Sequence, residues 1–335
     1  MVKEAITKVV DGADLTRDEA RSVMEELMSG QATDAQIGSF LTALRLKGET
    51  VDEITGMVEV MRAHATPIKT KHEVTTDTCG TGGDRSDTFN ISTLSALVAA
   101  GAGACVAKHG NRSVSSFCGS ADILKSLGVN IEIGPDKVGQ CLDEAGIGFL
   151  FAPLLHGAMK HVIGPRREMG IRTAFNILGP MTNPAGATRQ VIGVYDPALV
   201  ESLAGVLQNL GSEHVMVFNG SGLDELTTTG PSQVAELKGG KVTTYTLDPE
   251  ELGIKPAQLA DIKGGSVEES TVISRNILKG EPGPCRDIVL LNAGAAIYVS
   301  GKAGDLKEGV RLAAESIDSG KAQSTLDNLV KVSNS

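Results

Sequence analysis

The chain has 335 residues, of which 41% are hydrophobic and 21% charged, and its formal net charge is −10. A chain of this size and polarity buries a substantial core, which excludes a disordered, collagen-like or disulfide-stapled class of protein. The negative charge argues against nucleic-acid and membrane-surface binding, since both favour a positive field. Five cysteines without a C-x-x-C pair indicate reduced thiols, and neither a signal-peptide pattern nor a membrane-spanning run occurs, so we expect a cytoplasmic protein.

The first 65 residues predict three short helices. Each begins with a capping box, in which a threonine side chain and a side chain three residues later each accept a backbone amide of the other. Glycines follow the first two helices, as is typical of helix ends. The boxes are Thr16-x-x-Glu19, Thr33-x-x-Gln36 and Thr50-x-x-Glu53, and the glycines are Gly30 and Gly48.

Beyond Pro67 the pattern changes to short β-branched runs, glycine-rich turns and helical segments. Strands that alternate with helices predict an α/β protein: a small all-helical domain plus a larger α/β domain whose mainly parallel central sheet is flanked by helices. Strands are expected at 74–76, 105–107, 191–194 and 215–218. We expect residues 1–66, joined in space by part of 156–185, to form the helical domain, and 67–155 with 186–335 to form the other.

The segment Asp77–Asp84, DTCGTGGD, follows the first expected strand. Its glycines leave backbone amides free to converge on an anion, although a tight turn with no ligand would also use glycine. Asn90–Thr93 follows and opens a helix, which adds an anion site at the helix N-terminus. The two elements together favour phosphate binding. Neither a Walker A motif nor a G-x-G-x-x-G fingerprint is present, which disfavours ATPase and NAD-binding functions.

The segment Lys108–Ser116, KHGNRSVSS, follows the second expected strand. Lysine and arginine supply positive charge, while glycine and serines supply compact donors, a composition suited to a diphosphate. A solvated surface turn is the alternative, but it explains poorly why the segment lies between an apolar strand and a helix that starts near Ser120.

Asp224 and Glu225 follow the strand that ends near Phe218. Adjacent carboxylates beyond a strand suit Mg²⁺, which prefers oxygen ligands and commonly shares them with substrate phosphates. Taken alone, such a pair is most often exposed surface charge. The phosphate motifs elsewhere in the chain raise the metal interpretation to equal weight.

Several long segments, taken in order, resemble the anthranilate phosphoribosyltransferase family over essentially the whole chain. They are DTCGTGGD, NIST, KHGNRSVSS with CGSADIL, GPRREMGIRTAFNILGPMTNPAG, GLDEL and RDIVLLNAGAA. The resemblance implies an active site between the two domains and a homodimer built through the helical domain. It also implies the transfer of a phosphoribosyl group from 5-phosphoribosyl 1-diphosphate (PRPP) to anthranilate, a step of tryptophan biosynthesis, with a pair of Mg²⁺ ions at each active site.

The resemblance also assigns site residues, segment by segment. PRPP would contact Gly80, Gly83, Asp84, Thr88, Asn90, Ile91, Ser92, Thr93, Lys108, His109, Gly110, Asn111, Arg112, Ser113, Val114, Ser115, Ser116 and Ser120. Anthranilate would contact Gly80, Asn111 and Arg166, and Mg²⁺ would be held by Ser92, Asp224 and Glu225. In the segment His156–Lys160 the chain has Gly157 where the family commonly has proline, which leaves the contact of this loop with anthranilate open.

The expected chemistry is electrostatic. Displacing diphosphate from C1 of the ribose places negative charge on the leaving group, which Mg²⁺, Lys108 and Arg112 would stabilise. The aromatic amine is neutral at physiological pH, so we expect no indispensable general base, and His109 and His156 are interpreted as positioning or packing residues.

Two other functions stay open on the sequence. A pyrimidine nucleoside phosphorylase would share the architecture and the chemistry at C1 of ribose, but that family lacks the Asn111-Arg112 pair and the GLDEL segment. A non-catalytic relative that binds nucleic acid would need a basic groove, which the net charge of −10 disfavours.

Overall fold

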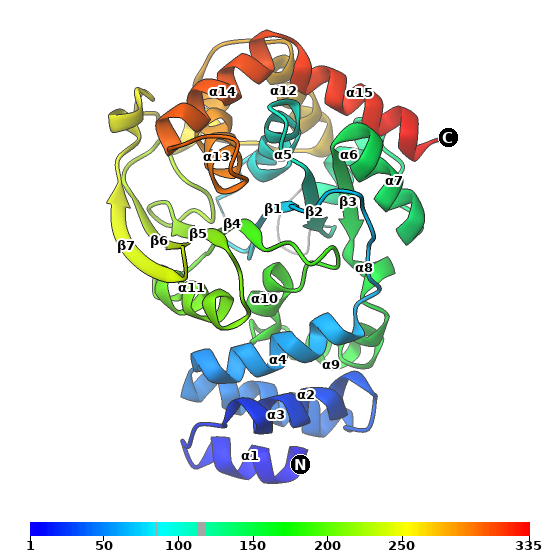
Figure 1. Ribbon diagram of the computed structural model, residues 1–335. Helices are drawn as coiled ribbons and strands as arrows, with labels where there is room; N and C mark the ends of the chain where they lie inside the picture. Colours follow the sequence, from blue (N-terminus) through cyan, green and yellow to red (C-terminus); the bar gives the residue numbers. More distant parts are fainter. Residues whose placement is uncertain (85, 113–117) are drawn as a thin grey trace.

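The computed structural model describes residues 1–84, 86–112 and 118–335. Its N-terminal region holds four helices, one more than predicted: α1 (Val2–Val10), α2 (Arg17–Met28), α3 (Asp34–Lys47) and α4 (Val51–His64) (Figure 1). All three predicted capping boxes are confirmed, because Thr16, Thr33 and Thr50 each accept the expected amide and receive the reciprocal bond. The additional helix, α1, follows Met1, which provides no capping side chain, so it lacked the start signal used to predict the others.

The remaining chain is built on one seven-stranded sheet of order β3-β2-β1-β4-β5-β6-β7. The strands are β1 (Thr76–Gly80), β2 (Val106–Gly110), β3 (Ile147–Phe151), β4 (Arg189–Gly193), β5 (His214–Asn219), β6 (Ser232–Lys238) and β7 (Lys241–Leu247). The five strands from β3 to β5 are mutually parallel, and β6 and β7 add an antiparallel edge. The predicted fold class, a helical domain with a mainly parallel α/β domain, is confirmed.

Two strand positions differ from the prediction. The first strand begins only at Thr76 and continues through Cys79 to Gly80, and the second includes Lys108, His109 and Gly110. The first four residues of Asp77–Asp84 and the first three of Lys108–Ser116 are therefore strand. β1 pairs with β4 over its whole length and β2 pairs with β3 in the same way, so ladder hydrogen bonds outweigh the poor strand propensity of Asp and Gly.

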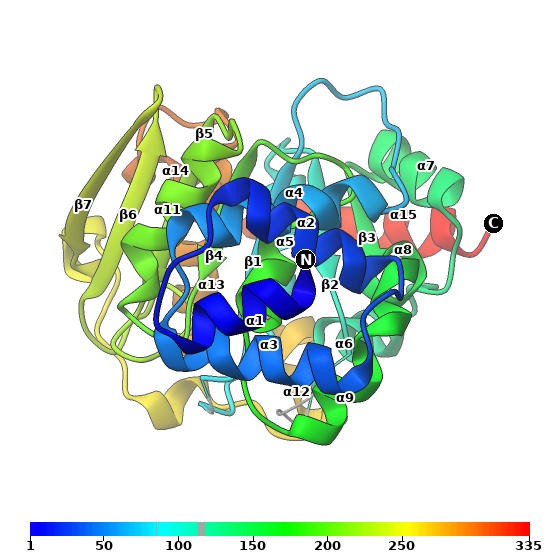
Figure 2. The same cartoon turned by 90° about the horizontal axis from the view of Figure 1, so that it is seen from below.

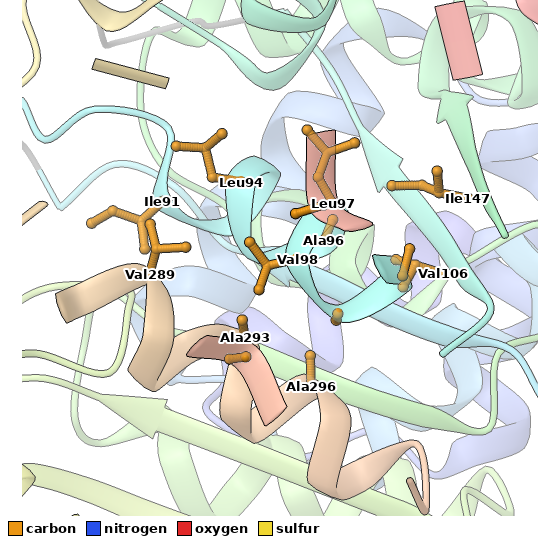
Figure 3. Packing of buried hydrophobic residues seen from close by; sticks show 14 of the residues in the cluster. Ile91, Leu94, Ala96, Leu97, Val98, Val106, Ile147, Val289, Ala293 and Ala296 are labelled. Atoms are coloured by element: carbon orange, nitrogen blue, oxygen red, sulfur yellow. The ribbon is translucent and has the colours of Figure 1, made fainter. Parts of the chain in front are cut away.

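Helices cover both faces of the sheet (Figures 1 and 2). Those of the α/β region are α5 (Ile91–Gly101), α6 (Ser120–Ser126), α7 (Pro135–Ala145), α11 (Leu199–Asn209), α12 (Val267–Leu278), α13 (Pro284–Val299), α14 (Leu306–Asp318) and α15 (Lys321–Ser333), with short 3₁₀ turns η3 (Pro249–Leu252) and η4 (Leu259–Ile262). Figure 3 shows Val98 of α5 pointing toward Ala293 of α13, with Ala296 of α13 near it and Val106 of β2 beside them. The small side chains let the two helices approach closely.

Residues 152–181 return to the N-terminal helices. They form α8 (Ala152–Leu155), η1 (Gly157–His161), α9 (Ile163–Met169), α10 (Phe175–Leu178) and η2 (Gly179–Met181). Phe175 and Leu178 belong to one buried cluster with Phe40 and Leu44 of α3. Within the described ranges, no helix is both long and apolar enough to span a membrane.

Candidate active site

The carboxyl ends of β1, β2, β4 and β5 meet at one edge of the sheet, the usual place for ligands in parallel α/β sheets. The segment after β5 turns back across this edge. Gly80 ends β1 and Gly193 ends β4, and a Cβ on either glycine would collide with Asp224, at its carboxylate and its backbone carbonyl respectively. The two glycines therefore make room for the acidic segment.

The acidic segment joins the two predicted phosphate elements. Asp224 Oδ2 accepts the amide of Gly82 at 2.7 Å, and Glu225 Oε1 accepts the amide of Ser92, in the first turn of α5, at 3.2 Å. Burial raises the pKa of Asp224, and the neighbouring Asp84 raises it further. Burial, followed by the charge of Asp224, raises the pKa of Glu225 well above its usual range. The site thus concentrates negative charge that an added cation would neutralise.

Lys108 is the buried cation of the site, with 2% of its surface exposed. Its Nζ donates to the carbonyl of Thr78 at 2.5 Å and to Ser92 Oγ at 3.2 Å. Burial lowers the pKa of Lys108, while the charges of Asp77, Cys79 and Glu225 act in the opposite direction. The strand position of Lys108 fixes its side chain beneath the N-terminus of α5, where it lies next to the predicted metal ligand Ser92.

His109 and His156 form a buried pair beside this group. Their Nε2 atoms are 3.1 Å apart, so one ring donates and the other accepts. The amide of His109 donates to Asp77 Oδ1 at 3.0 Å. Burial lowers the pKa of His109 to about 3, with a further contribution from His156, and lowers that of His156 to about 4. Both rings are therefore neutral at physiological pH, and neither is poised as a general base near pH 7.

The other predicted PRPP residues lie around the same edge of the sheet, and some of their polar groups form hydrogen bonds within the chain. Ile91 and Thr93 are buried in the first turn of α5. Asn90 Nδ2 donates to the Cys118 carbonyl at 2.8 Å, and Thr88 Oγ1 lies 3.3 Å from Ser86 Oγ. These contacts shape the loop between β1 and α5.

Beyond β2, the hydroxyl of Ser120 donates to the carbonyl of Asn111 at 3.2 Å, which draws the start of α6 toward the strand end at Gly110. Arg112 pairs with Glu132 at 3.1 Å rather than with the Lys108 group. The predictions at Ser113, Val114, Ser115 and Ser116 lie outside the described residues.

Arg166 lies on α9, half-buried, with its guanidinium 4.8 Å from the ring centroid of Phe175. Burial lowers its pKa from the ordinary arginine value. Among the described residues no hydrogen bond joins Arg166 to Gly80 or Asn111, the other two residues predicted to contact anthranilate. Gly157, at the family's proline position, begins η1 with open space around its Cα.

Sequence reasoning missed a cavity of about 600 Å³ that borders the glycine-rich loop. It is lined by Arg45, Gly83, Asp84, Gly170, Ile171, Arg172 and Tyr195. The guanidinium of Arg172 donates to the Gly83 carbonyl and lies 4.1 Å from the ring centroid of Tyr195. Arg172 is inside the long GPRREMGIRTAFNILGPMTNPAG segment, but three arginines in that stretch gave no signal for which one reaches the loop.

The residues fit a magnesium ion. Asp224, Glu225 and Ser92 offer oxygen donors only, and Glu225 Oε2 accepts no hydrogen bond from the part of the chain that the structure describes. Within that part, no group of three or more His, Cys, Asp or Glu side chains is arranged to hold a metal by itself. Two carboxylates that rely on a substrate for further oxygen ligands are the usual arrangement for Mg²⁺, which keeps waters and binds phosphates.

Comparison with protein families matches both parts of the chain. Residues 3–65 match the family described as "Glycosyl transferase family, helical bundle domain", and residues 72–323 match "Glycosyl transferase family, a/b domain". The fold and these two matches therefore define a glycosyl transferase of this two-part type.

Curated relatives narrow the class. The chain is 56% identical to an anthranilate phosphoribosyltransferase of Moorella thermoacetica, over 98% of both chains, and 54% identical to one of Acetivibrio thermocellus, over 100% of this chain and 97% of the relative. It belongs to the anthranilate phosphoribosyltransferase family, as the resemblance predicted. The alternative functions, nucleoside phosphorolysis and nucleic-acid binding, are not favoured.

Solved structures of the same family have the same fold as this chain. The Thermus thermophilus anthranilate phosphoribosyltransferase superposes with a TM-score of 0.94 at 45% identity, covering 99% of each chain. The Saccharomyces cerevisiae enzyme, solved in complex with PRPP and Mg, superposes with a TM-score of 0.90 at 27% identity, covering 99% of this chain and 98% of that one.

Proposed function

We propose that this edge of the sheet is where the chain carries out its family's reaction. The chain transfers the phosphoribosyl group of PRPP to the amine of anthranilate, which gives N-(5-phosphoribosyl)anthranilate and diphosphate in tryptophan biosynthesis. The observation that carries the proposal is the joining of Gly82, Ser92 and the Asp224–Glu225 pair, from three distant segments, around the buried Lys108. Glycine amides, a helix N-terminus and two carboxylates are what a magnesium diphosphate requires.

Mg²⁺ is the cofactor of this reaction, and the PRPP and Mg complex of the yeast relative supports its use here. We assign Ser92, Asp224 and Glu225 as the protein ligands and propose a pair of ions per site. The ions would supply positive charge to the departing diphosphate. Lys108 contributes to the same stabilisation from below α5, and the glycine-rich loop binds the phosphate oxygens through its amides.

Catalysis then rests on positioning and charge. Gly80, Asn111 and Arg166 are proposed to hold anthranilate, with the guanidinium of Arg166 facing the carboxylate. Arg112 would stabilise the diphosphate after exchanging its exposed partner Glu132 for the ligand. The neutral His109–His156 pair supports a mechanism without a general base, because the amine nucleophile carries no proton that must leave before attack.

A homodimer through the helical domain is also proposed. Val10 of α1, Leu46 of α3 and Ile163 of α9 are 67%, 83% and 51% exposed. Figure 2 shows these three helices on one face of the molecule. The joining of part of 156–185 to residues 1–66 is supported by the packing of α9 against α3 and of η1 against α2. The odd number of cysteines supports a cytoplasmic location.

The deciding experiment follows the loss of anthranilate fluorescence on addition of PRPP and Mg²⁺, with and without EDTA. A loss that needs PRPP and disappears with EDTA supports the reaction and the metal. Asp224→Asn with Glu225→Gln should abolish it, while the exposed Glu250→Gln serves as the matched control. No loss with folded protein, or phosphate-dependent cleavage of thymidine or uridine instead, would contradict the proposal.

A further inference from the structure

The glycine-rich loop is held by one arginine in addition to the carboxylate of Asp224. Arg172 follows α9 after Gly170, which ends that helix in a left-handed conformation, with φ of 62°. Its guanidinium donates to the carbonyl of Gly83 and stacks 4.1 Å from the ring centroid of Tyr195. A planar guanidinium that stacks on a ring and donates in that plane has a fixed direction.

The ring beneath the guanidinium is tied to the same loop. The amide of Tyr195 donates to Thr81 Oγ1 at 3.1 Å, and the amide of Thr81 donates to the Gly193 carbonyl at 2.9 Å. Arg172 therefore contacts the loop at Gly83, and Tyr195 contacts it at Thr81. Asp224 Oδ2 accepts the amide of the intervening Gly82.

The direction of the Gly83 carbonyl sets that of the next amide. In a planar trans peptide the C=O and the following N–H point in opposite directions, so a carbonyl aimed at Arg172 turns the amide of Asp84 away from the guanidinium. The carboxylate of Asp84 is already engaged, since it accepts the amide and hydroxyl of Ser86 at 3.2 and 2.7 Å. Its amide has no acceptor among the residues that the structure describes, which leaves it available to an anionic ligand.

Arg172 is also hydrogen-bonded to the helical region. Arg45 of α3 donates from Nη1 to the backbone carbonyl of Arg172 at 2.8 Å. Arg172 itself makes no ion pair with a carboxylate in the described part of the chain, so its contacts are a carbonyl, a ring and the carbonyl bond from Arg45. A surface charge with no further role would not be held by three separate segments.

We propose that Arg172 is a positioning residue for PRPP, which fixes the Gly83 peptide so that the Asp84 amide meets the diphosphate, and which links this loop to α3 through Arg45. The inference rests on the proposed function for the identity of the ligand. Arg172 acts through the loop, so its loss should weaken PRPP binding while leaving the anthranilate site and the chemical step intact.

The test compares Arg172→Lys with the exposed neighbour Arg167→Lys as the matched control. Lysine keeps the charge but loses the fork and the stacking plane, so a positioning role predicts that Arg172→Lys raises KM for PRPP about tenfold. The turnover number and KM for anthranilate should stay within about threefold of the parent values. Arg167→Lys should match the parent protein in all three.

A second pair of variants tests the ring. Tyr195→Leu should raise KM for PRPP in the same direction, and Tyr195→Phe, which keeps the ring, should recover most of the loss. An Arg172→Lys protein with parent affinity for PRPP, or one in which KM for anthranilate rises equally, overturns the proposal. Titration calorimetry of PRPP with Mg²⁺ reports the same difference in Kd without turnover, so failure of the proposed reaction and failure of this inference remain distinguishable.

Discussion

The buried histidine pair predicts that its own contribution to the stability of the protein is lost in mild acid. Histidine in an unfolded chain has a pKa near 6.5. Burial lowers that of His109 to about 3 and that of His156 to about 4. Below pH 6.5 the unfolded state therefore binds protons that the folded state does not. The stabilisation is complete above pH 6.5 and is lost as the pH falls toward 4 and 3, at up to about 1.4 kcal/mol per pH unit for each ring.

Urea unfolding at pH 7, 6 and 5 measures this slope. His156→Gln removes one of the two titrating rings and should make the pH dependence shallower, whereas the exposed His72→Gln should leave it unchanged. A pH dependence in His156→Gln equal to that of the parent protein would show that the pair does not contribute to acid stability.

The same pair bears on catalysis. Because both rings are already neutral at pH 6, neither should impose an inflection on turnover between pH 6 and 8. We expect His109→Ala and His156→Ala each to lose less than about a hundredfold in turnover, the scale on which a general base acts. Losses above that in both variants, with substrate affinities intact, would argue for a general base after all.

At the scale of single residues, the sequence identified residue types suited to the site's chemistry, but it did not identify the residues that contact them in the fold. The Asp224–Glu225 pair and Lys108 were singled out because their chemistry is unusual beside glycine-rich turns. Arg172 was not, since nothing in its local spacing distinguishes it from Arg166 and Arg167. Its role depends on a contact with Gly83, 89 residues away, that only the tertiary fold creates.

At the scale of elements, the end of β4 must stay free of side chains. A Cβ at Gly193 would overlap the backbone carbonyl of Asp224, and backbone cannot swing aside as a flexible side chain can. We expect Gly193→Ala to displace the acidic segment, to lower the free energy of unfolding by about 1–3 kcal/mol and to abolish Mg²⁺-dependent turnover. Thermal unfolding and the fluorescence assay measure the two effects.

Gly164→Ala in α9 is the matched control for that substitution. Its new Cβ meets open space and its φ is not left-handed, so alanine should be neutral or stabilising by up to about 1 kcal/mol. A Gly193→Ala protein with parent stability and activity would mean that the segment after β5 adapts, and that its position is less tightly fixed than the contact implies.

The accuracy of the element predictions followed the strength of local signals. Capping boxes located three helices, because side chain and backbone there satisfy each other within four residues. β6 and β7 were not among the strands named, although Gly239 and Gly240 between them, both with positive φ, are a recognised hairpin signal. The ends of β1 and β2, at Gly80 and Gly110, could not be found locally, since pairing with neighbouring strands determines them.

At the scale of the whole molecule, the fold class followed from alternating strand and helix patterns, but the strand order did not. The site depends on that order. β1 lies between β2 and β4, which brings the loop after β1 to Lys108 on one side and to the segment after β5 on the other. Gly82 and Asp224 are 142 positions apart, and no spacing rule relates them. The resemblance to a family supplied what residue patterns alone did not.

The proposed homodimer gives the last prediction. Leu46 is 83% exposed on α3, a helix that lies on the same face of the molecule as α1 and α9 (Figure 2). It therefore adds little stability to the monomer, and we propose that it is buried between two copies. Leu46→Glu should therefore dissociate the dimer without lowering the stability of each protomer, because a charge buried there is unpaired. Val272→Glu, at a 58% exposed position on α12 at the other end of the molecule, is the control (Figure 1). Light scattering after size-exclusion chromatography measures the mass. A parent protein that is monomeric would contradict the proposed homodimer, and a Leu46→Glu protein that stays dimeric would place the contact elsewhere.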